Sequence, residues 1–528
     1  MTTAITIGMI IIYVAIMMGI GVYTARQTRS VSDFVLGSHS VGSWLTAFAY
    51  GTSYFSAVVF IGYAGQFGWT YGVSAAWVGV GNALLGSLLA WIVLGRRTRI
   101  MTQSLGAKTM PEYFEKRWNS KGLKIAAALI VFVFLIPYTA SVYNGLSRLF
   151  NMAFQIESEG AYKIIIIVMA LLTAIYVILG GYAATAINDF IQGIVMLIGI
   201  AAVVICAIQN QGGLTSALAA LGEIEVNGKT NTLNSVFGPD PLNLLGVVIL
   251  TSLGTWGLPQ MIHKFYAIKS ENDIKKGAVI STVFALIVAG GSYLLGGFDR
   301  LFCTLTEDGS DKTVISTLSN GKPDFDAMIP SLLHTALPDI LIGLVVVLVL
   351  SASMSTLSSL VLTSSSTLTI DLIKPNLKKC SDKKEMLIMR VLIAVFLVIS
   401  VLLAFNKNAS ISTLMSYSWG ALAGAFLGSF MYGLFSRKIT KPAVWTSFIL
   451  GIGLTLVHMF LFGFGWNPEL SKAAASLPLN LASPINAGAI TMLLSLIVVP
   501  VVSALTKVKD PKHVEQVFTC YAAPEKQD

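Results

Sequence analysis

The sequence has few charged residues. Of its 528 residues, 12% are Asp, Glu, Lys or Arg, whereas 55% are hydrophobic, and the mean hydropathy is +0.75. Soluble domains carry about 25% charged residues, so this composition excludes a soluble globular protein. Apolar stretches of roughly 20 residues, each long enough to cross a bilayer, recur along the whole chain. We therefore expect an all-α protein that crosses a membrane many times.

Cysteine and histidine are also scarce. The five histidines are dispersed, and the cysteines show neither a disulfide framework nor metal-ligand spacing; they are Cys206, Cys303, Cys380 and Cys520. No metal-ligand cluster or nucleophile–base pair is apparent, which speaks against an enzyme. The sequence likewise indicates no cofactor and no obligatory protein partner.

The apolar stretches predict thirteen membrane spans in a single transporter domain over residues 1–528. No basic residue precedes the first span, whereas Arg26 and Arg29 follow it. A cleaved signal peptide has the opposite charge pattern, so we expect a retained helix whose N-terminus lies outside. The spans cover approximately residues 5–24, 43–66, 71–95, 124–147, 162–181, 187–208, 241–263, 277–298, 337–369, 387–405, 411–435, 443–464 and 487–506, followed by a short tail at 507–528.

The distribution of basic residues supports this membrane topology. When the chain starts outside, 27 of its 35 Lys and Arg residues fall on the cytoplasmic side, among them the clusters at 95–99, 116–124, 269–276 and 378–384. This asymmetry follows the positive-inside rule and predicts a cell-membrane protein with a cytoplasmic C-terminus. It also accounts for the net charge of +9, so nucleic-acid binding has no support. The residues left outside are Arg148, Lys163, Lys229, Arg300, Lys312, Lys322, Lys407 and Lys472.

Two spans contain helix breakers near their middle. Gly51 precedes a run of hydroxyl residues in the second span, and Gly254, Gly257 and Pro259 interrupt the seventh. Taken singly, these residues also fit ordinary glycine packing and a proline kink. The spacing of the two interrupted spans favours another interpretation. When the first span is set aside, the ten spans that follow form two halves of five, and each half begins with an interrupted span. That pattern is typical of an inverted-repeat transporter. The expected repeats cover about 43–208 and 241–435, and 5–24, 443–464 and 487–506 are extra helices.

The stretch "SASMSTLSSLVLTSSSTLT" (351–369) contains twelve Ser or Thr residues among nineteen. Hydroxyls in membrane helices often bond to the carbonyl one turn back, and that alternative stays open for each residue. So many hydroxyls on one helix nevertheless indicate a polar contact, and neutral oxygens suit a monovalent cation such as sodium. Asp189 is an acid at the expected start of a span, where it is either a helix N-cap or a functional intramembrane carboxylate.

Four stretches together resemble the solute:sodium symporters, nearest to their proline and pantothenate carriers. They are "FVLGSHSVG" (34–42), "IYVILGGYAATAINDFIQG" (175–193), "GLPQMIHKFYAIKS" (257–270) and "SASMSTLSSLVLTSSSTLTIDLIK" (351–374), and the resemblance extends from about residue 5 to 440. It implies a LeuT-like core of five plus five helices and sodium-driven symport. The implied sodium ligands are Thr52, Phe55, Ala352, Ser355 and Thr356. A second cation site, which some members carry, corresponds to Asp189, Ser355, Ser358 and Ser359.

The resemblance also implies a solute site, at Tyr54, Ser56, Tyr138, Thr255, Trp256 and Pro259. Trp256 is equally compatible with interface packing, and Tyr138 with a core aromatic. The family's proline carriers have an acid at the position of Tyr54, so this chain is more similar there to the pantothenate carriers. We expect sodium-coupled import of a small organic solute that bears a carboxylate. The alternatives are a sodium-coupled carrier of an uncharged solute such as a sugar, or a cation channel.

Overall fold

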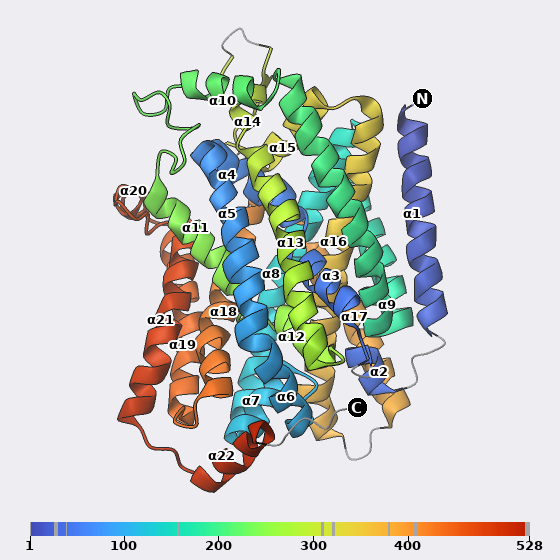
Figure 1. Cartoon of the computed structure of the whole chain (residues 1–528), viewed down its shortest axis with the longest axis vertical. Coiled ribbons are helices and arrows are strands. Elements are labelled where there is room, and N and C mark those ends of the chain that lie inside the picture. The colour runs from blue at the N-terminus through green and yellow to red at the C-terminus, as the bar shows by residue number, and fades with distance from the viewer. Residues whose placement is uncertain are drawn as a thin grey trace.

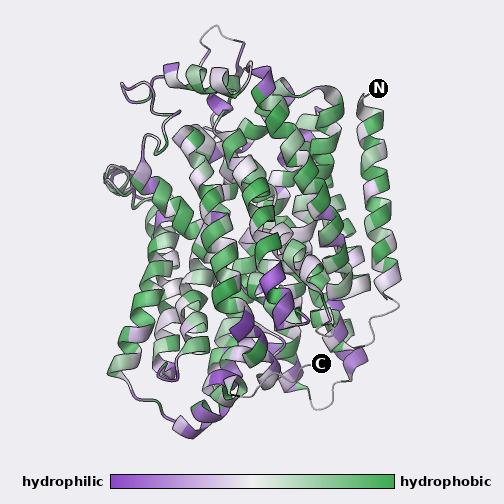
Figure 2. Ribbon diagram, in the orientation of Figure 1, coloured by the Kyte–Doolittle hydropathy of each residue, from purple (hydrophilic) through white to green (hydrophobic). Residues whose placement is uncertain are grey.

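The computed structural model describes residues 2–25, 30–37, 40–155, 158–307, 311–318, 321, 323–377, 381–405 and 410–522. The charges of Arg26, Arg29, Lys322 and Lys407, part of the cluster at 378–384, Cys380 and the tail beyond 522 therefore lie outside the described residues. The chain is a bundle of long helices, as predicted (Figure 1). Apolar residues dominate the middle of the bundle, and polar residues gather towards its two ends (Figure 2).

Eleven helical segments of the described chain are long and apolar enough to cross a membrane. Six are single helices close to the predicted spans: α1 (Thr2–Ala25), α8 (Lys121–Phe154), α13 (Glu271–Gly296), α17 (Asp382–Ala404), α18 (Ile411–Phe435) and α21 (Pro484–Leu505). A seventh is α16 (Asp339–Thr367) with its continuations η7 (Leu368–Ile373) and η8 (Lys374–Asn376). An eighth is α19 (Lys441–His458) with its continuation η9 (Met459–Gly463).

Two segments are much longer than a bilayer requires. One covers residues 58–105 and the other 160–210, so each would measure roughly 70–80 Å as a straight helix, against a hydrocarbon core of about 30 Å. A glycine with positive φ interrupts each of them, Gly72 at 62° and Gly181 at 56°. Division at these glycines agrees with the predicted spans on either side, although the length criterion alone does not confirm the exact count of thirteen.

The segment around Gly181 is α9 (Glu159–Asn210), and its contacts show that it turns back. Near its start, Tyr162 donates a hydrogen bond to Asn144 late in α8, and near its end Cys206 contacts the Ala336 carbonyl just before α16. Both ends therefore lie at the same face of the bundle, and the turn lies at the other. The second half begins at Tyr182, earlier than the predicted 187, so Asp189 lies two turns inside a helix. The N-cap interpretation of Asp189 is wrong for this reason.

The segment around Gly72 combines several short pieces with α-, 3-10 and π-helical hydrogen bonding. They are η2 (Val58–Tyr63), α4 (Ala64–Tyr71), η3 (Gly72–Ala75), α5 (Ala76–Gly81), η4 (Asn82–Leu89), η5 (Trp91–Gly95) and α6 (Arg96–Leu105). Before it stands α3 (Ser43–Tyr54), which ends inside the bundle. The other interrupted segment consists of α11 (Pro241–Gly254) and α12 (Pro259–Ala267).

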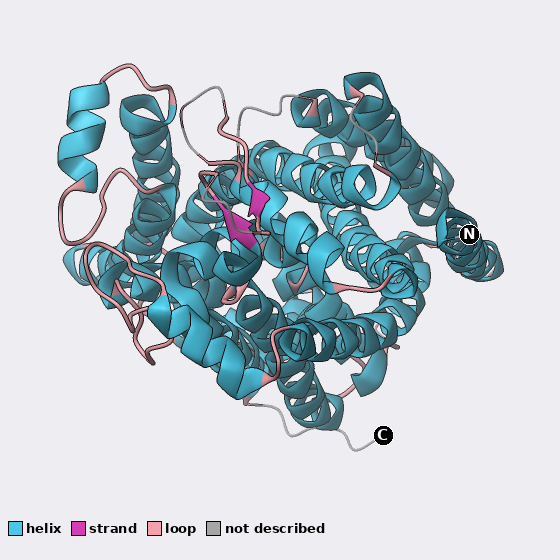
Figure 3. Cartoon of the chain, turned by 90° about the horizontal axis from the view of Figure 1, so that it is seen from above, coloured by secondary structure: helices cyan, strands magenta, loops and turns pink. Residues whose placement is uncertain are grey.

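Short elements cover the two ends of the bundle. The end that carries the start of α1, called here the upper face, bears α10 (Leu214–Glu223), α14 (Asp299–Phe302) and α15 (Met328–Ala336), and α20 (Pro468–Ala475) lies at the side of the bundle near α11 (Figure 1). Two short strands, β1 (Cys303–Thr304) and β2 (Thr313–Val314), follow α14. The two strands pair in parallel across the helix ends (Figure 3). The lower face bears α2 (Val31–Leu36), α7 (Met110–Trp118) and α22 (Pro511–Phe518).

The helices differ in how much lipid they would meet. In α16 and α18, 83% of the most apolar window is buried, whereas in α1 only 22% is buried. Figure 3 accordingly shows α1 at the rim of the bundle. The hydroxyl-rich helix α16 is therefore a central helix with protein on all sides, which explains why so many polar groups are tolerated in it.

Candidate functional site

The first interrupted helix breaks directly after α3. Phe55 has extended backbone angles (φ −100°, ψ 95°), its N–H bonds to the Gly51 carbonyl, and helical structure resumes near Val58. A helix that ends at Tyr54 leaves the carbonyls that follow Gly51 without intrahelical partners, and that of Thr52 is one of them. The predicted glycine, Gly51, thus lies one turn before the break that it helps to allow.

The Thr52 carbonyl faces α16. Ser355 donates to it at 2.9 Å and Thr356 at 3.3 Å, and both hydroxyls also lie 3.1 Å from the Ala352 carbonyl oxygen. Four of the five residues predicted as sodium ligands are therefore within hydrogen-bond distance of one another, although more than 300 positions separate Thr52 from Ser355. Such a cluster offers several neutral oxygens and no formal charge, which suits a monovalent cation.

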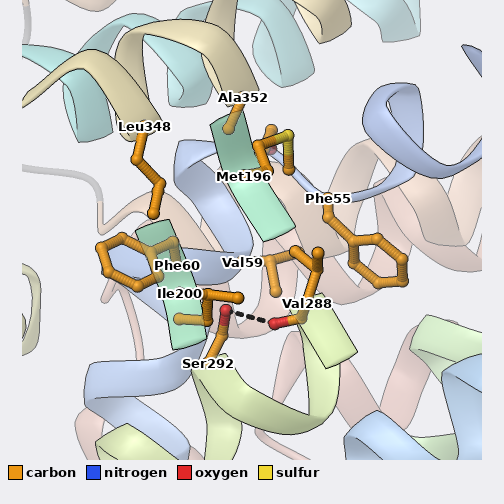
Figure 4. A pocket seen from close by; sticks show the side chains of 10 residues that line it. Phe55, Val59, Phe60, Met196, Ile200, Val288, Ser292, Leu348 and Ala352 are labelled. Atoms are coloured by element: carbon orange, nitrogen blue, oxygen red, sulfur yellow. Dashed lines mark hydrogen bonds between the residues drawn. The ribbon is translucent and has the colours of Figure 1, made fainter. Parts of the chain in front are cut away.

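Phe55, the fifth predicted ligand, lies next to this cluster. It lines a small cavity of about 10 Å³ together with Ala352, and Figure 4 shows the two residues with apolar neighbours from η2, α9, α13 and α16. A volume of this size holds roughly one water molecule. The described conformation is therefore closed at this point, since an organic solute needs far more room.

Other hydroxyls of α16 follow the alternative interpretation. Ser353, Ser358 and Ser366 donate to carbonyls three or four residues earlier in the same helix. Part of the hydroxyl stretch therefore reaches other helices: Ser355, Thr356 and Ser359 contact α3, and Ser359 also contacts α12. Residue type alone does not separate the two groups.

Two of the four residues predicted for a second cation site, Asp189 and Ser359, contact a lysine, whereas Ser355 and Ser358 donate to backbone carbonyls. Asp189 is fully buried, and the Lys264 ammonium nitrogen lies 3.6 Å from its Oδ2 atom. The same nitrogen donates to the Ser359 hydroxyl at 3.0 Å, and this hydroxyl is 2.7 Å from that of Ser53. The predicted seventh span ends at residue 263, which leaves Lys264 among the cytoplasmic residues. That was wrong, because α12 continues to Ala267 and buries Lys264, leaving 2% of it exposed.

The second interrupted helix breaks between α11 and α12. Pro259 is the first residue of α12, where its missing N–H costs nothing. Gly257 permits close packing, because a Cβ there would lie 2.7 Å from the Ala423 backbone. Thr255 donates to the Gly86 carbonyl and the Trp256 indole donates to that of Leu85, each at 2.9 Å. These two predicted solute residues are therefore bound to η4, which agrees with the interface-packing interpretation of Trp256.

Tyr54 and Tyr138 meet at a third aromatic residue, Trp419 of α18. Its ring stacks with Tyr54 at a centroid distance of 6.0 Å and meets Tyr138 edge-on at 5.9 Å. The Tyr54 hydroxyl donates to the Thr251 carbonyl, which joins the two interrupted helices. The buried Tyr138 hydroxyl lies beside both Ser56 and the Trp419 indole N–H, although among the described residues neither the hydroxyl nor the indole makes a hydrogen bond of conventional geometry. Two unpaired donors in an aromatic cluster can receive a carboxylate or carbonyl oxygen.

Trp419 was missed by the sequence analysis. It stands in "YSWGALAG" within an apolar helix, where a tryptophan gives no signal that separates packing from binding. The group of Tyr54, Ser56, Tyr138 and Trp419 is called the aromatic cluster below.

The known proteins that resemble this chain include proline transporters. The chain is 30% identical to the Sodium/proline symporter of Staphylococcus aureus (strain JH9) over 459 residues, 85% of each protein. It is 28% identical to the Osmoregulated proline transporter OpuE of Bacillus subtilis (strain 168) over 455 residues, 84% of this chain and 87% of that one.

Two solved structures share the fold. A Na⁺-coupled sialic acid symporter, in a substrate-bound outward-open state, superimposes with a TM-score of 0.70 at 18% identity, covering 96% of this chain and 98% of that one. The nucleobase-cation-symport-1 family transporter MHP1, in a closed conformation, gives a TM-score of 0.51 at 13% identity, with 92% and 98% covered. The predicted LeuT-like fold is thereby confirmed.

The sequence profile of one family covers most of the chain. It is that of the sodium:solute symporter family, and it matches residues 34–451. This match confirms the expected sodium-coupled symporter, and the family and the relatives named above are transporters, not enzymes. The chain belongs to the sodium:solute symporter family.

Proposed function

We propose that the protein imports a small carboxylate-bearing solute of the proline or pantothenate type together with sodium. The hydrogen bonds from Ser355 and Thr356 to the Thr52 carbonyl carry this proposal, since they bring neutral oxygens of two helices together at a helix break. The proline transporters among the relatives support the solute class. Tyr54, which replaces the acid of the proline carriers, leaves pantothenate as an equal candidate.

Sodium would bind between α3 and α16. Its ligands would be the carbonyls of Thr52, Phe55 and Ala352 and the hydroxyls of Ser355 and Thr356. In the described structure these hydroxyls donate hydrogen bonds to the Thr52 and Ala352 carbonyls. The same carbonyls would bind the sodium ion together with the hydroxyls. Sodium would turn the hydroxyl lone pairs and the carbonyls towards one centre, replacing those hydrogen bonds by ion–oxygen contacts.

The solute would bind at the aromatic cluster, between the two helix breaks. The cluster contains no charged side chain, so the carboxylate would be held by the Tyr138 hydroxyl, the Trp419 indole N–H and free backbone N–H groups. Thr255, Trp256 and Pro259 would shape the second break. Contact of Thr255 or Trp256 with the solute would require that their hydrogen bonds to η4 open.

The hydrogen bonds around Gly86 suggest which parts move together. Its carbonyl accepts from Tyr50 of α3 at 2.7 Å and from Thr255 at 2.9 Å, so both interrupted helices are attached to η4. The proposed sodium site joins this group to α16. Sodium binding would therefore control the boundary between a moving group of helices and the rest of the bundle, as alternating access requires.

The proposed repeats cover about 43–208 and 241–435 within one transporter domain, and each begins with an interrupted helix. In the plasma membrane, the upper face would lie outside, because the basic clusters at 95–99, 116–124 and 269–276 lie towards the lower face. Reporter fusions should then place residue 2 outside and the tail inside. A tail on the outside would contradict the proposed orientation.

The proposal is tested with purified protein. A thermal-shift screen of proline, pantothenate, other carboxylates and sugars, with and without sodium, would identify ligands, and uptake into proteoliposomes with an inward sodium gradient would measure transport. We expect sodium-dependent uptake of a carboxylate. Its amide analogue should bind at least about tenfold more weakly, the effect of ~1.4 kcal/mol. Equal binding of the amide, or a sugar as the best ligand, would refute the carboxylate class and leave sodium symport intact.

A further inference from the structure

Lys264 is a cation buried inside the bundle. It belongs to α12, the lower half of an interrupted helix, and its side chain is 2% exposed. The ammonium nitrogen contacts Asp189 of α9 at 3.6 Å and Ser359 of α16 at 3.0 Å, and it lies 5.3 Å from the centre of the Tyr182 ring. A buried charge persists only when other groups compensate it, and here a carboxylate, a hydroxyl and an aromatic face do so.

The charge of the Asp189 carboxylate is in turn compensated mainly by Lys264. Its side chain is fully buried, and neither carboxylate oxygen has a conventional hydrogen-bond partner in the described structure. The ion pair with Lys264 is therefore the main interaction that compensates its charge. Asp189 is also the single charged residue of the second cation site that the family resemblance implies, and Ser359 belongs to the same site.

We propose that the Lys264 ammonium takes the place of the second sodium ion, so that this protein couples one sodium ion to each solute. The proposal rests on the proposed function as a sodium-coupled importer. It assigns to Lys264 the role of a tethered cation that determines the number of coupling ions. The ammonium already carries the positive charge that Asp189 and Ser359 would offer to sodium.

Two cations would compete for the same carboxylate and hydroxyl. An ion held by Asp189 and Ser359 would approach their oxygens to roughly 2.3–2.6 Å, the usual range for a cation of this size. The Lys264 nitrogen already lies 3.6 Å and 3.0 Å from the same two residues, so a sodium ion there would stand close to a second positive charge, with a single carboxylate in contact to compensate both. Sodium would therefore have to displace Lys264 from the only carboxylate that it contacts in the described structure.

Sodium counting tests the proposal without any solute. Equilibrium binding of radioactive sodium to the purified protein should give one ion per chain. Lys264→Ala removes the charge and opens space, so it should bind two ions. Lys264→Met removes the charge but fills the space, and Lys264→Ala with Asp189→Asn removes the carboxylate, so both should bind one. Lys275→Ala, an exposed lysine near the lower end of α13, is the matched control and should bind one.

Two ions bound to the unmodified protein, or one ion bound to a folded Lys264→Ala variant, would overturn the proposal. Lys264→Ser is a second variant, because its small hydroxyl adds an oxygen to the opened site. If Lys264→Ala is unstable, sodium should restore folding of Lys264→Ser. Instability of both at every sodium concentration would show a purely structural ion pair and also overturn the proposal.

Transport measurements extend the test. The ratio of sodium flux to solute flux, measured with radioactive sodium and radioactive solute, should be one for the unmodified protein and two for Lys264→Ala. Absence of uptake for every solute in the screen would refute the proposed function, while the sodium count would still decide the role of Lys264. The two failures are therefore distinguishable.

Discussion

Removal of both hydroxyls from the proposed sodium site should weaken sodium binding strongly. In the double variant Ser355→Ala/Thr356→Ala, only the carbonyls of Thr52, Phe55 and Ala352 remain as ligands. A hydrogen bond to a charged group contributes about 1.5–3 kcal/mol, and an oxygen that faces sodium is of similar strength. Loss of two such oxygens amounts to roughly 3–6 kcal/mol, or a factor of about 10² to 10⁴ in the sodium dissociation constant.

The structure predicts a smaller effect on stability. Both hydroxyls donate to the Thr52 and Ala352 carbonyls, so their removal leaves buried acceptors with fewer partners. Each net loss is about 1 kcal/mol, which a folded membrane protein tolerates. The double variant should therefore insert and fold, while sodium no longer raises its melting temperature at concentrations that stabilise the unmodified protein.

The assay compares the half-maximal sodium concentration for uptake and for thermal stabilisation. Ser353→Ala is the control, because Ser353 is buried in the same helix but donates only to the Val349 carbonyl one turn back, at 2.6 Å. Its sodium dependence should be unchanged. If the double variant shows the sodium dependence of the unmodified protein, the oxygens of Ser355 and Thr356 are not ligands and the proposed site is wrong.

Three further predictions concern other parts of the structure. Burial raises the pKa of Asp326, beside η2 and the start of α18, to about 6, so its contribution to stability is full below about pH 4 and is lost as the pH rises through 6. Relative to Asp326→Asn, the free energy of unfolding of the unmodified protein should fall by on the order of 3 kcal/mol between about pH 4 and pH 6. A difference in melting temperature between the two proteins that does not change with pH would contradict this. Gly68→Ala should destabilise the protein by about 1–3 kcal/mol or more, because the new Cβ would lie 2.0 Å from the Gly296 carbonyl. Gly453→Ala is the control and should not destabilise it, because a Cβ at Gly453 would meet open space. Equal melting temperatures of the two variants would refute the close helix contact at Gly68. Tyr138→Phe should raise the solute concentration for half-maximal uptake several-fold while leaving sodium binding without solute unchanged, and an unchanged solute affinity would show that Tyr138 is a packing residue.

The helix breaks could be predicted from the sequence because backbone chemistry sets them. Glycine and proline lower the cost of unwinding or remove a donor wherever they stand, so Gly51 and Pro259 indicated both interruptions to within about one turn. The oxygen cluster around Ser355 followed from hydroxyl density together with the family resemblance. Helix ends were less certain, and the start of the helix that contains Asp189 was placed five residues too late.

Lys264 and Trp419 could not be placed in the same way, because their positions depend on partners far away in the sequence. A lysine at the end of an apolar stretch ordinarily marks the membrane surface. Lys264 is buried only because Asp189, 75 residues earlier, and Ser359, 95 residues later, converge on it in the folded bundle. Trp419 likewise becomes part of a cluster only when α18 packs between Tyr54 and Tyr138.

The lysine beside Asp189 also bears on how steeply a cell can concentrate the solute. One sodium ion entering with a solute of no net charge gains about 2.3 kcal/mol from 100 mV and about 1.4 kcal/mol from a tenfold sodium gradient. The sum of roughly 3.7 kcal/mol limits accumulation to about 500-fold, whereas a second ion would square that ceiling. With the proposed ratio of one sodium ion per solute, the carrier therefore reaches a lower maximum accumulation but admits fewer sodium ions per molecule of solute. It also releases its solute again once the sodium gradient falls.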